Sequence, residues 1–133
     1  MSVCNDVSPD CSTVLAQLRD DKKFKYIIYK VVNSMLVTDT TALDGDWDDL
    51  KERLLSDHPK YPAFAIYDFG QDYQHKLAFI SWLPDAVPPS IKITHESNRA
   101  VVKTMLDSPS IDIYASDSAD LDEGPILEHL DKV

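Results

Sequence analysis

Apolar residues recur along this chain with two spacings, one typical of amphipathic helices and the other typical of strands. The helical spacing occurs in four stretches, and each begins beside a residue that can cap or start a helix. These are a helix of about three turns after Ser8 and Pro9, a short helix capped by Asp46 or Asp48, a helix over 94–106 capped by Thr94, and a final helix opened by Gly124 and Pro125.

Stretches rich in β-branched and aromatic residues predict strands between these helices. They are 24–32 (FKYIIYKVV), 35–38, 63–68, 76–83 and 110–115, and a turn at Asn33-Ser34 joins the first two as a hairpin. The predicted order is therefore helix, hairpin, helix, strand, strand, helix, strand, helix. Because strands and helices interleave without regular βα alternation, we expect an α/β protein of the α+β type, with one mixed sheet covered by helices.

The same spacing predicts which side chains face the core. In order along the four helices they are Val14, Leu15 and Leu18; Trp47, Leu50, Leu54 and Leu55; Val101, Val102, Met105 and Leu106; and Ile126, Leu127 and Leu130. The third helix then turns Glu96, Arg99 and Lys103 outward, three and four residues apart.

Length and composition support one compact domain over residues 1–133. The chain is 44% hydrophobic, which is ordinary for a globular domain. It has no apolar run of the roughly 18 residues that a membrane span needs, and its first residues lack the features of a signal peptide. We therefore expect a soluble cytosolic protein and, by default, a monomer.

No motif for catalysis or metal binding stands out. Cys4 and Cys11 lack the spacing of a zinc or redox pair, so both are expected to be reduced. The stretch 44–49 (DGDWDD) has no glycine at the sixth position of a calcium loop and no glutamate at the twelfth, and we interpret it as a loop and helix cap. The 23 carboxylates nominate no catalytic pair by their spacing. We expect no enzyme activity, no metal and no cofactor.

The distribution of charge favours a protein partner. A formal net charge of −10 argues against nucleic acid and anionic lipid, which require clustered cations. Within this acidic chain, 73–106 is weakly basic, which suits an acidic partner protein. Arg99 and Lys103, with Lys92 just before the helix, could present a one-sided basic row; from spacing alone, an ordinary solvated helix face is the alternative.

Successive motifs resemble the ADF/cofilin family along nearly the whole chain. They are VSPDC before the first helix, KYIIYKV, PAFAIYDF, FISWLPDAVP, and a helix in which Ser97 is followed two positions later by a basic residue. The most specific block is 63–88. The resemblance implies the ADF-homology, gelsolin-like fold, a mixed sheet sandwiched between helices. It also implies binding to actin monomers and filaments, generally in the ADP state, with filament severing and disassembly and no cofactor.

The resemblance also assigns residues to roles. The helix over 94–106 and the N-terminal segment would enter a cleft between two actin subdomains, and a weaker filament site would touch the neighbouring subunit. The implied monomer site is Ser2, Val3, Lys92, Ile93, Ser97, Arg99 and Lys103, and the implied filament site is Lys76, Glu128 and Lys132. Ser2 is a candidate phosphorylation site, although Val3 stands where the family often has glycine. The implied location is the cytoplasm, on the actin cytoskeleton, and also the nucleus.

The chain departs from the family pattern around these positions. Ile93, His95 and Glu96 replace the usual Met, Tyr and small residue, and Ser90 and Thr104-Met105 replace lysines. We therefore expect monomer binding to survive, with filament binding, severing and phosphoinositide binding weaker than is usual. Two alternatives remain: a glia-maturation-factor-like protein that binds the Arp2/3 complex, and a small hydrolase, which would need a deep pocket with two facing carboxylates.

Overall fold

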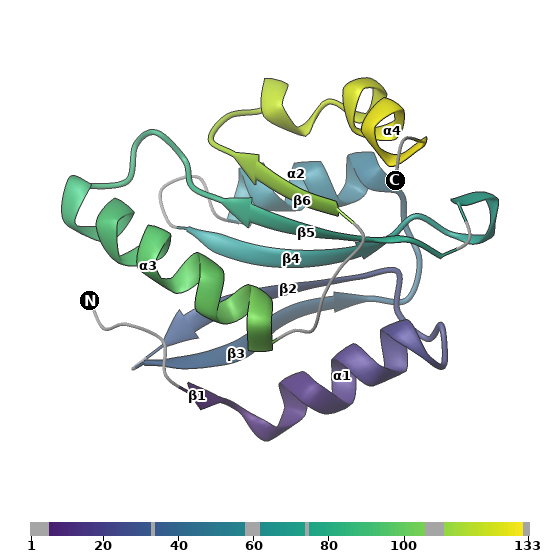
Figure 1. Ribbon diagram of the computed structural model, residues 1–133, viewed down its shortest axis with the longest axis horizontal. Coiled ribbons are helices and arrows are strands. Elements are labelled where there is room, and N and C mark those ends of the chain that lie inside the picture. Colours follow the sequence, from purple (N-terminus) through teal and green to yellow (C-terminus); the bar gives the residue numbers. More distant parts are fainter. Residues whose placement is uncertain (1–5, 33, 58–61, 74, 106–110, 132–133) are drawn as a thin grey trace.

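The computed structural model describes residues 6–32, 34–57, 62–73, 75–105 and 111–131. These residues form one six-stranded sheet in the order β1-β3-β2-β4-β5-β6, with helices on both faces (Figure 1). The elements are β1 (Asp6–Val7), α1 (Pro9–Arg19), β2 (Tyr26–Val32), β3 (Met35–Ala42), α2 (Trp47–Asp57), β4 (Ala63–Asp68), the 3-10 turn η1 (Gln71–Tyr73), β5 (Leu77–Trp82), α3 (Pro89–Met105), β6 (Ile111–Ala115), the 3-10 turn η2 (Ala119–Leu121) and α4 (Glu123–Asp131).

The sheet is mixed because its connections differ in length. β2 pairs antiparallel with β3 and with β4, and β4 pairs antiparallel with β5. The two edge strands are parallel to their neighbours, β1 to β3 and β6 to β5. A parallel pair requires a long crossover, and α3 supplies the one between β5 and β6. The predicted fold class, a mixed sheet between helices, is confirmed.

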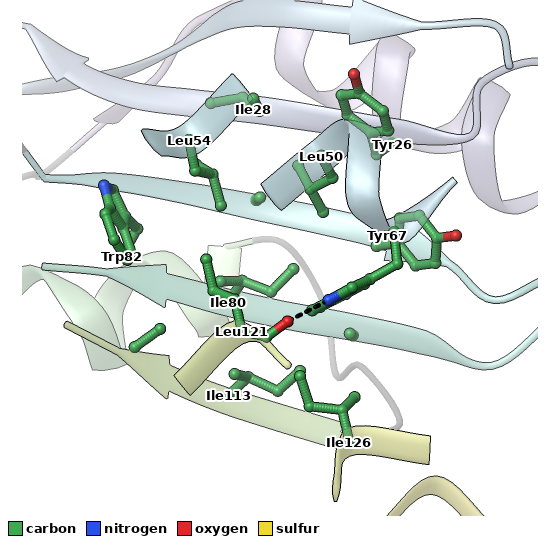
Figure 2. Close-up of a cluster of buried hydrophobic side chains, with 14 of the residues drawn as sticks. Tyr26, Ile28, Leu50, Leu54, Tyr67, Ile80, Trp82, Ile113, Leu121 and Ile126 are labelled. Carbon is green, nitrogen blue, oxygen red and sulfur yellow. Dashed lines mark hydrogen bonds between the residues drawn. The ribbon is translucent and has the colours of Figure 1, made fainter. Parts of the chain in front are cut away.

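One core lies between the sheet and the pair α2 and α4 (Figure 2). Trp47, the first residue of α2, packs edge-on to Tyr67 of β4 and stacks on Phe69, with ring centroids 5.1 Å and 5.7 Å away. Its indole N–H donates to the carbonyl oxygen of Leu121 in η2, at 2.5 Å. This bond ties two segments 74 residues apart, so it fixes α2 against the turn that leads into α4.

A second core lies between the opposite face of the sheet and the pair α1 and α3. It contains Cys11, Leu15 and Leu18 of α1, Val102 of α3, and strand residues that alternate with those of the first core: Ile27, Tyr29, Leu36, Phe64, Ile66 and Phe79. Every residue of β4 is buried, which explains why its sequence shows no clear alternation of apolar and polar positions.

The predicted bounds of α3 are wrong at the start of the helix. The helix begins at Pro89, five residues before Thr94, and the amides of Ile91 and Lys92 already donate to the carbonyl of Pro88. Proline is well suited to the first position of a helix because its missing N–H would have no intrahelical partner. Thr94 is therefore no cap: its hydroxyl donates to the carbonyl of Ser90, one turn back.

Smaller differences concern the strands and two helix faces. β3 continues beyond the predicted strand 35–38 to Ala42 because it pairs with the whole of β2, and β1 was not predicted at all. Leu55, predicted to face the core, is 36% exposed, and Val101 is half-buried. Of the two candidate caps of α2, Asp46 is used, since its carboxylate accepts the amide N–H of Asp49 at 3.0 Å.

Several predictions fall wholly or partly outside the described residues. They concern Asn33, Cys4, Leu106 and Ser110, together with the side chains of Met105 and Leu130. Cys11 is confirmed as a free, buried thiol. Among the helices described, none is both long and apolar enough to cross a membrane.

Replacing Trp47 by Phe should lower the free energy of unfolding by about 1–3 kcal/mol, because the substitution leaves the buried Leu121 carbonyl without its donor. Denaturant titration followed by Trp82 fluorescence would measure the change. The control is Leu43→Ala at a side chain that is 69% exposed, where a change within about 0.5 kcal/mol is expected. Equal losses in the two variants would contradict the structural role of Trp47.

Candidate functional site

The helix α3 divides its side chains into three rows. The inward row includes His95, Asn98 and Val102, all buried. A second row, Lys92, Glu96, Arg99 and Lys103, runs along the flank, and its last three members contact β6. A third row, Ile93, Ser97, Ala100 and Thr104, faces solvent. Helical spacing of three and four residues produces each row, so one element both covers the sheet and offers a surface.

His95 belongs to the core and not to a contact surface. Its ring is only 2% exposed and stacks on Phe64 with centroids 4.5 Å apart. Its Nε2 is hydrogen-bonded to the hydroxyl of Ser81 at 2.8 Å. Phe64 and Ser81 are cross-strand partners on β4 and β5, so the imidazole sits over a single site of the sheet. His95, which replaces a tyrosine of the family pattern, is therefore part of the interior in this protein.

Burial also sets the protonation state of His95. Removal from water lowers the pKa of this imidazole to about 4, and Glu96 opposes the shift only in part. The ring is therefore neutral near neutral pH. A neutral imidazole with a hydroxyl partner is an inexpensive polar group to bury.

The flanking row forms a network with β6. Arg99 Nη2 lies 2.8 Å from Asp112 Oδ1, and Lys103 Nζ lies 3.1 Å from Asp112 Oδ2. The guanidinium of Arg99 also lies over the ring of Tyr114, 5.3 Å from its centroid. The Tyr114 hydroxyl donates to Glu96. The pKa of Tyr114 is raised to about 12, mainly by partial burial and also by this hydrogen bond. Arg99 and Lys103, two of the three basic residues predicted to face a partner, are thus paired within the protein.

The outward row carries no charge. Ile93 is 69% exposed, while the hydroxyls of Ser97 and Thr104 donate to the carbonyls of Ile93 and Ala100 at 3.2 Å and 3.0 Å. These hydroxyls are satisfied within the helix and do not depend on water. Lys92, on the first turn of α3 and not before it, has no ion-pair partner among the described residues.

The other predicted site residues lie apart from α3. Lys76 immediately precedes β5, and its backbone closes the turn from β4 by bonding to Phe69 and Tyr73. Glu128 is exposed on α4, on the opposite face of the sheet from α3. The remaining three, Ser2, Val3 and Lys132, are outside the described residues.

Sequence reasoning missed the partners that β6 and β5 supply, namely Asp112, Tyr114 and Ser81. A signal for the first two exists. In β6, Ile111, Ile113 and Ala115 face the α2 and α4 core, so the residues between them must point to the α3 side. Nothing in the sequence indicates that Ser81 meets His95.

Several carboxylates lie together near the start of α2. An open hollow of about 790 Å³ is lined there by Asp44, Asp46, Asp49 and Arg53, among others. Asp46 caps α2, and Asp49 accepts the Tyr26 hydroxyl at 2.5 Å and lies 3.8 Å from Arg53. Asp46 and Asp49 therefore have structural partners. No group of metal-ligating side chains occurs in the portion of the chain that the structure describes.

Comparison with known proteins identifies the family. The sequence model of one protein family, the cofilin/tropomyosin-type actin-binding proteins, matches residues 5–131. The chain belongs to the ADF/cofilin family. Cofilin of Gibberella zeae is 30% identical, with 95% of this chain and 93% of that protein aligned, and actophorin of Acanthamoeba castellanii is 26% identical, with 95% and 94% aligned. The crystal structure of Streptomyces griseoflavus cofilin superposes with a TM-score of 0.83 at 23% identity, over 95% of this chain and 99% of that one.

Membership of the ADF/cofilin family confirms the resemblance drawn from the motifs. It is a family of actin-binding proteins and not a known class of enzyme. The fold of its solved relatives is the one described above.

The buried His95 predicts a specific dependence of stability on pH. Since its folded pKa of about 4 is below the ordinary value of 6.5, the unfolded chain binds the proton more readily between these values. Stability is therefore lost as pH falls through this window. Relative to His95→Gln, the wild type should lose about 2 kcal/mol between about pH 7 and about pH 4.5.

Denaturant titrations of both proteins across this range would measure the difference. An NMR titration of the His95 ring in the folded protein is the direct control, because it separates this group from the many carboxylates. A constant difference between wild type and variant would contradict a neutral, buried imidazole.

Proposed function

We propose that this protein binds actin monomers and filament subunits through α3 and promotes filament severing and disassembly. Family membership supports actin binding, and the sequences of cofilins and actophorin align with almost the whole chain. The surface that we assign to the monomer is Lys92, Ile93, Ser97, Arg99 and Lys103, with Ser2 and Val3 of the N-terminal segment. Disassembly would proceed without covalent chemistry or a cofactor.

The observation that carries this proposal is the exposure of Ile93. A large apolar side chain with 69% of its surface in water is unusual on a helix where Ile91 and Val101 are partly buried and Val102 is fully buried. Ile93 stands at the head of a row without charge, beside Lys92. A ridge of this kind suits insertion into an apolar cleft, with the amine left to meet a carboxylate at the rim.

The ion pairs of α3 support weaker filament binding than is usual in the family. Arg99 and Lys103 share Asp112, so only Lys92 remains as a cation without an ion-pair partner on the described part of this flank. We assign the filament contact to Lys76, Glu128 and Lys132. Weak phosphoinositide binding belongs to the same proposal, because anionic headgroups also require free cations.

Regulation and location complete the proposal. A phosphate on Ser2 would add negative charge to the N-terminal segment and oppose an acidic partner. The protein would work as a monomer in the cytoplasm, on the actin cytoskeleton, and also in the nucleus.

Replacing Ile93 by Asp should weaken binding to ADP-actin monomers by about tenfold or more, because a charge replaces an apolar anchor in the contact. Fluorescence titration of labelled actin would measure the affinity, and circular dichroism would verify that the variant is folded. The matched control is Leu43→Asp, which alters a side chain of the same 69% exposure between β3 and α2. Equal affinities of the two variants would rule out α3 as the binding surface.

A pull-down from cell extract gives a second test of the partner. Actin should be recovered with the wild type and lost with Ile93→Asp. Recovery of the Arp2/3 complex in place of actin would replace the proposed function by the alternative.

The weakened filament contact predicts incomplete pelleting with actin filaments. At physiological ionic strength the protein should remain largely in the supernatant at filament concentrations that leave monomer binding saturated, because Arg99 and Lys103 on the α3 flank are already paired with Asp112. A co-sedimentation titration over filament concentration would measure this. Tight, stoichiometric pelleting would contradict weak filament binding while leaving actin binding itself intact.

A further inference from the structure

The pairing between α3 and β6 has a functional consequence beyond the assignment of the binding surface. We infer that Asp112 is a built-in competitor that occupies Arg99 and Lys103 and thereby limits the affinity of α3 for an acidic partner. The inference rests on the proposed function, since it concerns the strength of that same contact. It adds a residue outside the predicted site and gives it a role opposite to that of a contact residue.

The geometry shows that one carboxylate is shared by two cations. Oδ1 of Asp112 meets Arg99 at 2.8 Å and Oδ2 meets Lys103 at 3.1 Å, so each oxygen has its own cation. The Asp112 side chain is only 24% exposed, and those of Arg99 and Lys103 are 30% and 41% exposed. Partial burial on this flank screens the attraction less than open solvent would.

Tyr114 closes the remaining side of the cluster. Its ring lies against the Arg99 guanidinium and its hydroxyl holds Glu96, the other acid of the row. Asp112 and Tyr114 are two residues apart on one strand face, and Glu96, Arg99 and Lys103 are three and four residues apart on one helix face. The four charged groups have a formal sum of zero. A partner therefore meets a neutral cluster, although the sequence shows a basic row.

A carboxylate of the partner has to compete with Asp112 for Arg99 and Lys103. Each new ion pair then replaces an existing one, so the net gain is small. Removing the competing charge should make both cations available. The expected result is a gain of affinity, whereas substitution of an ordinary contact or positioning residue produces a loss.

The test uses Asp112→Asn, which keeps the size of the side chain and removes its charge. The matched control is Asp122→Asn, which makes the same change in net charge and frees Lys51 from a 3.0 Å ion pair between α2 and the residue after η2. At low salt, Asp112→Asn should bind actin monomers about fivefold more tightly than wild type, and the gain should fall as salt is raised. Asp122→Asn should bind like wild type.

A second measurement needs no partner. Amine labelling of the free protein, resolved by mass spectrometry, should be several-fold faster at Lys103 in Asp112→Asn than in wild type. In Asp122→Asn the increase should appear at Lys51 instead. These rates report whether the ion pair between the Asp112 carboxylate and the Lys103 amine persists when the protein is in solution.

The outcomes separate the two ideas. Equal or weaker actin binding by Asp112→Asn, with wild type binding normally, would overturn the inference and make Asp112 a positioning residue. Absence of actin binding in all three proteins would refute the proposed function. In that case the labelling still tests whether Asp112 restrains the Lys103 amine. A faster rate at Lys103 in Asp112→Asn supports this restraint, and an unchanged rate overturns it.

Discussion

The structure depends on the burial of β4 on both of its faces. Every residue from Ala63 to Asp68 is buried, so the sheet must carry a layer of helices on each side. The aromatic and aliphatic side chains of β4 fill two separate cores, one under α2 and α4 and one under α1 and α3. Because the interior is fully used in this way, recognition is left to the outer faces of the helices, to the turns and to the edge strands.

Within this constraint α3 serves two purposes at once. Its inward row must satisfy the sheet, and the polar pair of His95 and Ser81 does so with a hydrogen bond and a stacked ring. That pair is directional, whereas contacts between aliphatic side chains are not, and it restrains the rotation of the helix about its own axis. The rotational position in turn decides which residues reach solvent, so the exposure of Ile93 follows from a contact on the opposite side of the helix.

Most of the fold could be predicted from periodicity and turn chemistry. The strand at 63–68 and the order of helices and strands after β1 agree with the structure, because the long apolar stretches are bounded by proline, glycine and charged residues. The start of α3 was misjudged because consecutive prolines suit a loop and a helix start equally well. β1 has only two residues, too few for any period, and depends on pairing with β3.

The candidate site was only partly predictable. Ser97, Arg99 and Lys103 share one helix, as their spacing predicts, and Lys92 and Ile93 join them because the helix begins at Pro89. What spacing cannot give is the state of each charge, since this depends on which strand lies beside the helix. The partner of Arg99 is Asp112, 13 residues later on the strand that follows α3. The partner of His95 is Ser81, on the strand that precedes α3. An exposed basic row and a neutralised one look alike in sequence.

The crossover unit β5-α3-β6 also makes this site separable from the rest of the molecule. Asp112 and Tyr114 alternate with three buried residues of β6, and both point away from the core that those residues fill. Substitutions at these two positions can therefore accumulate in a lineage without repacking the interior. In duplicated copies of such a gene, substitutions at these two positions could change the affinity for the partner in small steps while the fold stays the same. Strand residues outside the contact are therefore positions at which paralogues can diverge in affinity.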